Sequence, residues 1–342
     1  MPALRAVERL AGLQAQLPRP PFVALFGRLR GFRREELARL VACRAVLRAT
    51  FYRHTIHLVS ARDYLSWRST LQGALEQRAG GAMRRVRMDR AALVAEARAL
   101  YLERPRTFGE LRDLLARRHP GEDPVALAYT VRTMLPLVLV PGGEGEWAYP
   151  ANADFALAEA FLGEAPAPVR EAGREALALR YLAAFGPATA ADLRTWSGVA
   201  GQRDVLERLR PRLSAFRDEA GRELLDLPRA PRPDPDAPAP VRFLPDFDNL
   251  VLGHADRARV VPPPFKRAFA SMNGMVPGAV LVDGFVAGIW RWSATGESVR
   301  IDVRALRRLA RAERREVEEE GDALGRFLSP EAQRVQVRIR SG

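Results

Sequence analysis

Hydrophobic and polar positions follow two different patterns along this chain, and the change comes at a proline-rich segment. Before residue 228 most apolar residues recur at helical spacing, with short apolar runs between the helical stretches. Residues 228–240, PRAPRPDPDAPAP, can form only an extended linker or a surface crossing. Beyond them, four segments alternate as strands around one charged helix at 307–328. The strand segments are 241–254, 278–292, 298–303 and 334–340. The pattern therefore predicts an α+β protein with a small β-rich C-terminal module.

Two helical stretches begin with the same pattern, Pro-x-Thr-x-x-acid-Leu-Arg, which makes an internal repeat. Thr107 and Thr189 occupy its threonine position, where a hydroxyl can cap the first backbone amides of a helix. Glu110 and Asp192 follow three residues later, where a carboxylate can reach back to the cap residue. Both copies are therefore predicted to start helices.

Short apolar runs around turn residues predict three hairpins. The first spans 136–150 around a glycine-rich turn, and the second spans 213–228 with Glu219 to Gly221 at its tip. Each follows a pair of helical patterns, which is the element order of a winged helix. The third lies in the C-terminal module, with Asp283-Gly284 as its turn.

The N-terminal region shows the same order of elements, with predicted helices at 22–32 and 33–50 and a β-branched strand region at 51–64. We therefore predict three tandem winged-helix units. Few residues precede Gln14, so we expect the first helix to be short or N-terminally truncated. The predicted domains are 1–80, 81–165 and 166–228 for the winged helices, 229–240 for the linker and 241–342 for the C-terminal module.

The charge of the chain points to a polyanionic partner. Its net charge is +13 and its pI is near 11.0, and Lys266 is the only lysine among 54 basic residues. The forked guanidinium group of arginine suits phosphates and the edges of guanine bases. The excess of arginine over lysine is also typical of a GC-rich genome and of a solvated arginine surface. A single cysteine, Cys43, excludes an internal disulfide and multi-thiolate metal sites, and fits a reducing cytoplasm. We expect no export signal and no membrane span.

Gln14 and Gln16 stand two residues apart, just before the prolines of 18–21. Side chains two apart diverge on a helix and share a face in an extended segment. Because Pro18 ends any preceding helix, we expect both amides to converge at a helix exit, with Ala15 turned into the core. A surface glutamine pair with no chemical role is the alternative.

A pair of amides can orient a nucleophile without acting as a base. A glutamine carbonyl accepts a hydrogen bond from water and its NH2 donates one, but the amide takes no proton at neutral pH. Such a site suits a good leaving group. A cationic N7- or N3-alkylated purine is one, because its N-glycosidic bond breaks through an oxocarbenium-like state and the base departs neutral.

Four blocks of the sequence occur in order across nearly the whole chain. They are VERLAGLQAQLPRPPFVALFGRL, HTIHLVSARDY, RFLPDFDNLVLGHADRARVV and VLVDGFVAGIWRW. Together they resemble the AlkZ/YcaQ family of winged-helix DNA glycosylases. The resemblance implies three winged helices and a β-barrel-like C-terminal part around a basic DNA channel, and removal of alkylated bases, including interstrand crosslinks. The family's catalytic pattern, in its AlkZ-like form Gln-hydrophobic-Gln, falls on Gln14-Ala15-Gln16.

Other polar residues carry weaker expectations. His54 and His57 are three apart, which on a strand puts them on opposite faces and makes them a poor metal pair. Because their block belongs to the same unit as the glutamine pair, we expect one of them to face DNA with Arg53 and Thr55, which makes all four residues candidates for DNA binding. Structural histidines are the alternative.

Two further motifs admit a simple structural interpretation. The carboxylates of Asp246 and Asp248 have the spacing of a metal loop but lack the rest of one, which favours a turn. Trp290 and Trp292 alternate on a strand, where they could stack on bases or fill the core.

The sequence thus predicts a cytoplasmic, nucleoid-associated DNA glycosylase that acts as a monomer on double-stranded DNA containing alkylated bases, without metal or other cofactor. Only Lys266 and the N-terminus could supply the amine of a Schiff base, so we predict no lyase activity. The alternative is a non-enzymatic winged-helix protein such as a transcription regulator, which would bind a defined operator, usually as a dimer. A protein that shields damaged DNA without releasing a base is a third.

Overall fold

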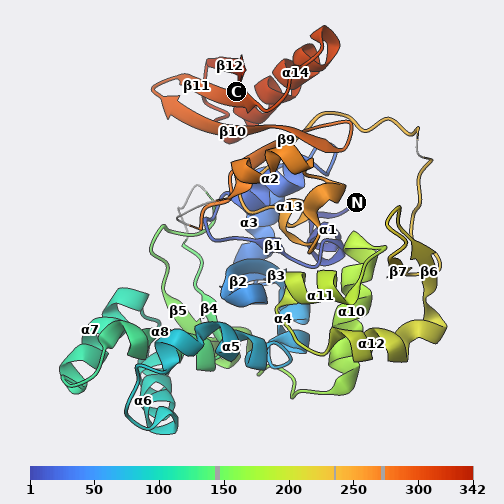
Figure 1. The fold of residues 1–342 in the computed structure, drawn as a ribbon. Helices are drawn as coiled ribbons and strands as arrows, with labels where there is room; N and C mark the ends of the chain where they lie inside the picture. Colours follow the sequence, from blue (N-terminus) through green and yellow to red (C-terminus); the bar gives the residue numbers. More distant parts are fainter. Residues whose placement is uncertain (143–146, 235, 271–273, 342) are drawn as a thin grey trace. The chain divides into compact units, whose positions relative to one another are not determined.

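The computed structural model describes residues 1–142, 147–234, 236–270 and 274–341, and these form two compact units (Figure 1). Unit 1 comprises Met1–Pro18 and Arg34–Ala230, and unit 2 comprises Arg19–Arg33 and Pro231–Gly342. Each unit contains helices and at least one sheet, so the predicted α+β class is confirmed. The winged-helix boundaries stay predictions. No helix in the described part of the chain is long and apolar enough to cross a membrane.

Unit 1 is mainly helical. Its helices are α1 (Ala3–Arg9), α3 (Arg34–Ala42), α4 (Ala61–Trp67), α5 (Gln72–Met83), α6 (Arg90–Glu103), α7 (Phe108–Arg118), α8 (Pro124–Met134), α9 (Ala158–Leu162), α10 (Glu171–Phe185), α11 (Ala190–Ser197) and α12 (Gln202–Leu209), with 3-10 turns η1 (Tyr52–His54) and η2 (Arg210–Arg212). Its strands are β1 (Leu13–Gln14), β2 (Val46–Thr50), β3 (Ile56–Ser60), β4 (Leu137–Leu139), β5 (Phe155–Leu157), β6 (Ser214–Arg217) and β7 (Glu223–Asp226).

Five of these strands form one antiparallel sheet in the order β1-β3-β2-β4-β5 (Figure 1). β2 lies at its centre and is buried along its whole length. The expectation of one helix over 33–50 is therefore wrong beyond Ala42. Arg44 takes a left-handed backbone with φ 59°, which ends the helix and lets the buried residues of β2 join the sheet.

The first predicted hairpin also differs from the structure. β4 pairs with β5, so its partner is Phe155–Leu157 rather than the apolar run at 147–150. The glycine-rich turn expected within 136–150 falls partly on residues 143–146, which lie outside the described residues. The second hairpin is confirmed, because β6 pairs with β7 in a register that puts Arg217 opposite Glu223.

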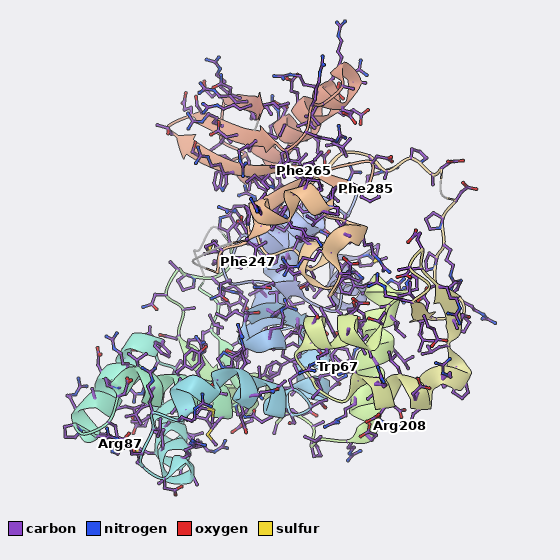
Figure 2. All side chains as sticks on the ribbon, viewed as in Figure 1. Trp67, Arg87, Arg208, Phe247, Phe265 and Phe285 are labelled. Carbon is purple, nitrogen blue, oxygen red and sulfur yellow. The ribbon has the colours of Figure 1, made fainter. Side chains whose placement is uncertain are left out.

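The repeated helix starts are confirmed in both copies. Thr107 caps α7 and Thr189 caps α11, and Glu110 and Asp192 complete a capping box in each. Large aromatic residues fill the main core of unit 1, among them Tyr52, Tyr64, Tyr181 and Trp196, each fully buried. Trp67, labelled in Figure 2, lies at the end of α4 with the Arg180 guanidinium 5.0 Å from its ring centre.

Unit 2 is built on a five-stranded sheet in the order β12-β11-β10-β9-β8. Its strands are β8 (Arg242–Leu244), β9 (Gly278–Val282), β10 (Phe285–Thr295), β11 (Ser298–Ala305) and β12 (Arg334–Ser341). Its helices are α2 (Pro20–Phe26), α13 (Asn249–Leu252) and α14 (Arg311–Leu328), with 3-10 turns η3 (Arg257–Arg259) and η4 (Pro263–Phe269). The predicted turn at Asp283-Gly284 is confirmed between β9 and β10.

α14 lies close to β12 because its glycines remove side-chain bulk at the contact. A Cβ at Gly325 would come within 2.3 Å of the Val335 side chain, and one at Gly321 within 3.0 Å of Val337. α2 joins the same unit, although its sequence lies near the N-terminus. Its Phe26 stacks on Phe327 of α14 with ring centres 4.6 Å apart.

Candidate active site

Gln14 lies on β1, the edge strand of the unit 1 sheet, directly opposite His57 of β3. The preceding helix ends before it, because Ala11 and Gly12 take left-handed backbones with φ 54° and 87°. A Cβ at Gly12 would lie 2.7 Å from a Val59 methyl, so only glycine fits this turn. The glutamine pair therefore follows a tight turn, with Gln14 on a strand and Gln16 at the bend after it, and does not lie at a helix exit as expected.

The two glutamines differ in exposure, and the residue between them is buried. Gln14 is 7% exposed and Gln16 is open to solvent, whereas Ala15 is fully buried as predicted. The Gln14 Oε1 accepts a 2.8 Å hydrogen bond from Arg53, and the Gln16 Oε1 accepts a long one, 3.4 Å, from the Ile56 amide. Both amide oxygens are thus bound by the single short segment 53–56.

Arg53 fixes the orientation of the Gln14 amide. One guanidinium nitrogen donates to Gln14 and another donates to the Trp196 carbonyl at 2.5 Å. Arg53 has φ 55°, a left-handed backbone that turns its side chain out of the path of β3. Arg53 engages the Oε1 of Gln14, and the NH2 of this amide has no hydrogen bond within the described residues, so the NH2 is available to a substrate.

A second arginine holds the backbone between the two glutamines. Arg48 on β2 donates through Nε and Nη2 to the Ala15 carbonyl at 3.2 and 2.8 Å. Burial lowers the pKa of Arg48 to about 10, an effect that neighbouring Tyr149 partly opposes, so this guanidinium stays charged at pH 7. Charged donors therefore hold both the Gln14 side chain and the backbone between the two glutamines.

His54 lies in η1 with φ 62°, so it does not share a strand with His57 as expected. Thr133 donates its hydroxyl proton to the Tyr129 carbonyl, so His54 Nε2 donates to Thr133 Oγ1 at 2.8 Å and its Nδ1 accepts from the Tyr129 hydroxyl at 3.1 Å. Burial, followed by the charge of Arg132, lowers the pKa of His54 to about 4. This imidazole is neutral at pH 7.

His57 is also buried and neutral. It is fully covered, and its Nδ1 lies 3.2 Å from the Thr55 carbonyl oxygen, while its Nε2 has no hydrogen-bond partner within the described residues. Burial, and after it the charge of Arg53, lowers the pKa of His57 well below its usual value. Of the four residues expected to face DNA, Arg53 and Thr55 are half-exposed and both histidines are buried.

Comparison with known proteins identifies the chain. Residues 7–327 match the family described as DNA glycosylase AlkZ-like. The chain belongs to the AlkZ-like DNA glycosylase family. The solved structure of Streptomyces sahachiroi DNA glycosylase AlkZ is similar in fold, with a TM-score of 0.77 and 21% sequence identity over 100% of this chain and 94% of that one. A comparison with curated proteins gives no match.

Membership of the AlkZ-like family makes this protein a DNA glycosylase, with DNA repair as its role and DNA as its partner. It decides against the alternative of a transcription regulator. The sequence resemblance to the AlkZ/YcaQ family is confirmed.

The remaining candidate residues lie in unit 2 and are mostly structural. Asp246 accepts from the Gly278 amide at 3.1 Å and pairs with Arg19 at 3.2 Å, and Asp248 caps α13. Trp290 is buried and donates its indole N–H to the Leu244 carbonyl at 2.7 Å.

Sequence reasoning missed the roles of Arg48 and Arg53 in holding the glutamine segment. Arg53 had been expected to face DNA, and its bond to Gln14 joins residues 39 positions apart. The only local signal was the sequence Phe51-Tyr52-Arg53, which places an arginine directly after two aromatic residues and just before a predicted strand region. The Trp196 carbonyl, which completes the Arg53 site, left no signal in the sequence.

Proposed function

We propose that this DNA glycosylase hydrolyses the N-glycosidic bond of cationic N7- or N3-alkylated purines, with Gln14 and Gln16 as the catalytic residues. The observation that carries the proposal is the Gln14 amide, buried on an edge strand and held by the charged donor Arg53. Both nearby histidines are neutral, so neither supplies a proton at pH 7. A site of this kind suits a leaving group that already carries its positive charge.

The two amides have complementary tasks in this proposal. The Gln14 NH2 donates to the attacking water, while the bond from Arg53 to its Oε1 fixes the orientation of the amide. The Gln16 Oε1, whose bond to the Ile56 amide is long, accepts a hydrogen bond from that water. The water oxygen then forms a bond to C1′ while the bond from C1′ to the purine nitrogen breaks. The electron pair neutralises the departing base, and the extra proton of the water passes to solvent.

The proposed product is an abasic site in an intact strand. Lyase chemistry needs an amine to form a Schiff base, and Lys266 and the N-terminal amine are the two groups in the sequence that could supply one. We therefore propose a monofunctional enzyme. The same reaction on a crosslink joined through two N7 atoms would unhook the two strands.

Excision from a duplex with a single N7-methylguanine tests the proposal. Wild-type protein should yield strand breaks only after heating in alkali, and Gln14→Ala or Gln16→Ala should reduce them. Gln333→Ala, which removes an exposed glutamine of unit 2, is the matched control and should retain full activity. Wild-type activity in both site variants would rule out this assignment. Breaks before alkali would rule out the monofunctional reaction.

A duplex crosslinked by a nitrogen mustard tests the wider substrate range. Unhooking converts the crosslinked species into two single strands on a denaturing gel. Release of N7-methylguanine without unhooking would restrict the activity to monoadducts.

A further inference from the structure

A cavity of about 460 Å³ opens on unit 1 where the start of α5, α10 and the turn between α11 and α12 meet. Its polar lining includes Ser69, Thr70, Gln77 and Arg174, together with the backbone of Val199 to Gly201. No carboxylate lines it. A volume of this order accommodates a phosphate with part of its sugar.

Two polar groups in this cavity have no partner within the described part of the chain. The Arg174 guanidinium makes no hydrogen bond or ion pair there, and one of its nitrogens would lie 3.9 Å from a Cβ placed on Gly201. Thr70 is only 7% exposed and lines the cavity, yet its hydroxyl has no hydrogen bond. The Thr70 Oγ1 itself is accessible to solvent, so a ligand or water in the cavity can hydrogen-bond to it.

The first turn of α12 follows directly on the cavity lining at Gly201 and carries one carboxylate, Asp204. α12 begins at Gln202 behind a left-handed Gly201, and no side chain caps its first turn. The free amides of a helix start and an unpaired guanidinium both attract an anion.

The cavity also adjoins the segment that holds the glutamine pair. A Cβ at Gly198 would lie 3.7 Å from the backbone of Arg53 and 3.7 Å from Ala74 of α5. The turn that begins at Gly198 therefore joins η1, where Arg53 binds Gln14, to the cavity lined by Gly201. DNA lying across Gln14 would pass its backbone beside this turn.

We propose that this cavity binds a backbone phosphate of the DNA, with Arg174 as its charged ligand and the Thr70 hydroxyl as a neutral donor. The inference rests on the proposed site at Gln14 and Gln16 for the position of the DNA. The phosphate anchors the strand beside the damaged nucleotide, and its contact carries no base specificity.

DNA affinity tests the assignment without requiring base release. Arg174→Gln should weaken binding of a lesion-containing duplex about tenfold and reduce the salt dependence of binding by about one unit of slope. Thr70→Val should cause a smaller loss. Arg117→Gln, which removes an exposed arginine of α7, loses the same charge and should change affinity far less. Equal losses in Arg174→Gln and Arg117→Gln would overturn the proposal in favour of a general charge effect.

A neutral linkage locates the phosphate. Single methylphosphonates are placed in turn along a duplex whose N7-methylguanine carries a 2′-fluorine to slow its release. Wild-type affinity should fall about tenfold at one position near the lesion, and Arg174→Gln should show no further loss at that position while keeping the losses elsewhere. Further loss of the same size in Arg174→Gln would overturn the assignment.

Inorganic phosphate distinguishes DNA from a small anion as the ligand. If phosphate raises the thermal denaturation midpoint of the wild type but not of Arg174→Gln, while both bind DNA equally, the cavity serves a free anion and the proposal fails. A wild type that binds DNA through Arg174 but releases no base would sustain this inference and overturn the proposed function. Thermal denaturation of each variant shows that it is folded.

Discussion

Arg53→Ala should slow excision of N7-methylguanine by about 10- to 100-fold. Arg53 donates a 2.8 Å charge-assisted hydrogen bond to the Oε1 of Gln14 and a second bond to the Trp196 carbonyl. A hydrogen bond to a charged group contributes about 1.5–3 kcal/mol, and each 1.4 kcal/mol is a factor of about ten in rate. Without it the Gln14 amide can rotate and its NH2 no longer points at the water.

The rate is measured in single turnovers with enzyme in excess and at saturating DNA, so that weaker DNA binding does not enter it. Arg53→Lys should lie between the wild type and Arg53→Ala. A single ammonium cannot span the Gln14 oxygen and the Trp196 carbonyl with the geometry of a guanidinium.

A double-mutant cycle with Gln14→Ala shows whether Arg53 acts through Gln14. If it does, Arg53→Ala should cause little further loss of rate once Gln14 is alanine. The reasoning is refuted if Arg53→Ala slows excision by the same factor in both backgrounds, because Arg53 would then act on the DNA directly. If an Arg53 variant has a lowered thermal denaturation midpoint, only the double-mutant cycle is interpreted, because the loss of stability is present both with Gln14 and with Ala at position 14.

Three further changes test the fold around the site. Gly12→Ala should lower the free energy of unfolding, measured in urea, by about 1–3 kcal/mol and should reduce excision. The left-handed turn that precedes β1 leaves no room for a methyl group at this position. An unchanged free energy of unfolding would disprove the close contact. His54 has a pKa of about 4 in the folded protein, below its value near 6.5 in the unfolded chain. Its contribution to the free energy of unfolding is therefore complete above pH 6.5 and is lost as pH falls toward 4, by about 3 kcal/mol in all. His54→Gln should make the free energy of unfolding less dependent on pH in that window, and an unaltered slope would contradict the neutral imidazole. Thr189→Ala should lower the free energy of unfolding by about 1 kcal/mol through loss of the α11 capping box. Thr189→Ser keeps the capping hydroxyl, so an equal loss in that variant would argue against the cap.

Local signals in the sequence predicted the elements that depend on neighbours in the chain. The capping residues Thr107 and Thr189 started helices where expected, and Asp283-Gly284 formed the turn between β9 and β10. These features depend on hydrogen bonds and backbone angles within a few residues. Apolar alternation likewise located β9 to β12 in unit 2, but the strand expected over 241–254 is confirmed only at Arg242–Leu244, because α13 forms at Asn249–Leu252.

Features set by distant partners could not be predicted in the same way. The helical spacing of apolar residues in 33–50 predicted a helix where β2 forms. The residues of β2 are buried on both faces, so they lack the alternation of apolar and polar residues that marks a half-exposed strand. Ala15 was placed in the core correctly, but the strand that carries Gln14 depends on pairing with β3, and the orientation of its amide depends on Arg53. The glutamine pattern could be found from the sequence because its two amides stand two residues apart and lie in one of the four blocks that carry the family resemblance.

The path of the chain through α2 limits how this enzyme can be divided. The polypeptide leaves unit 1 after Pro18, contributes Phe26 and Phe32 to the aromatic contact with Phe327, and returns at Arg34. A truncation at the proline-rich segment would therefore leave an N-terminal fragment whose helix α2 has lost its contact with Phe327. The C-terminal fragment would expose the apolar surface that Phe26 and Phe32 cover. Expression of either half alone should give aggregation-prone material, and mixing the halves should restore solubility if they reassemble.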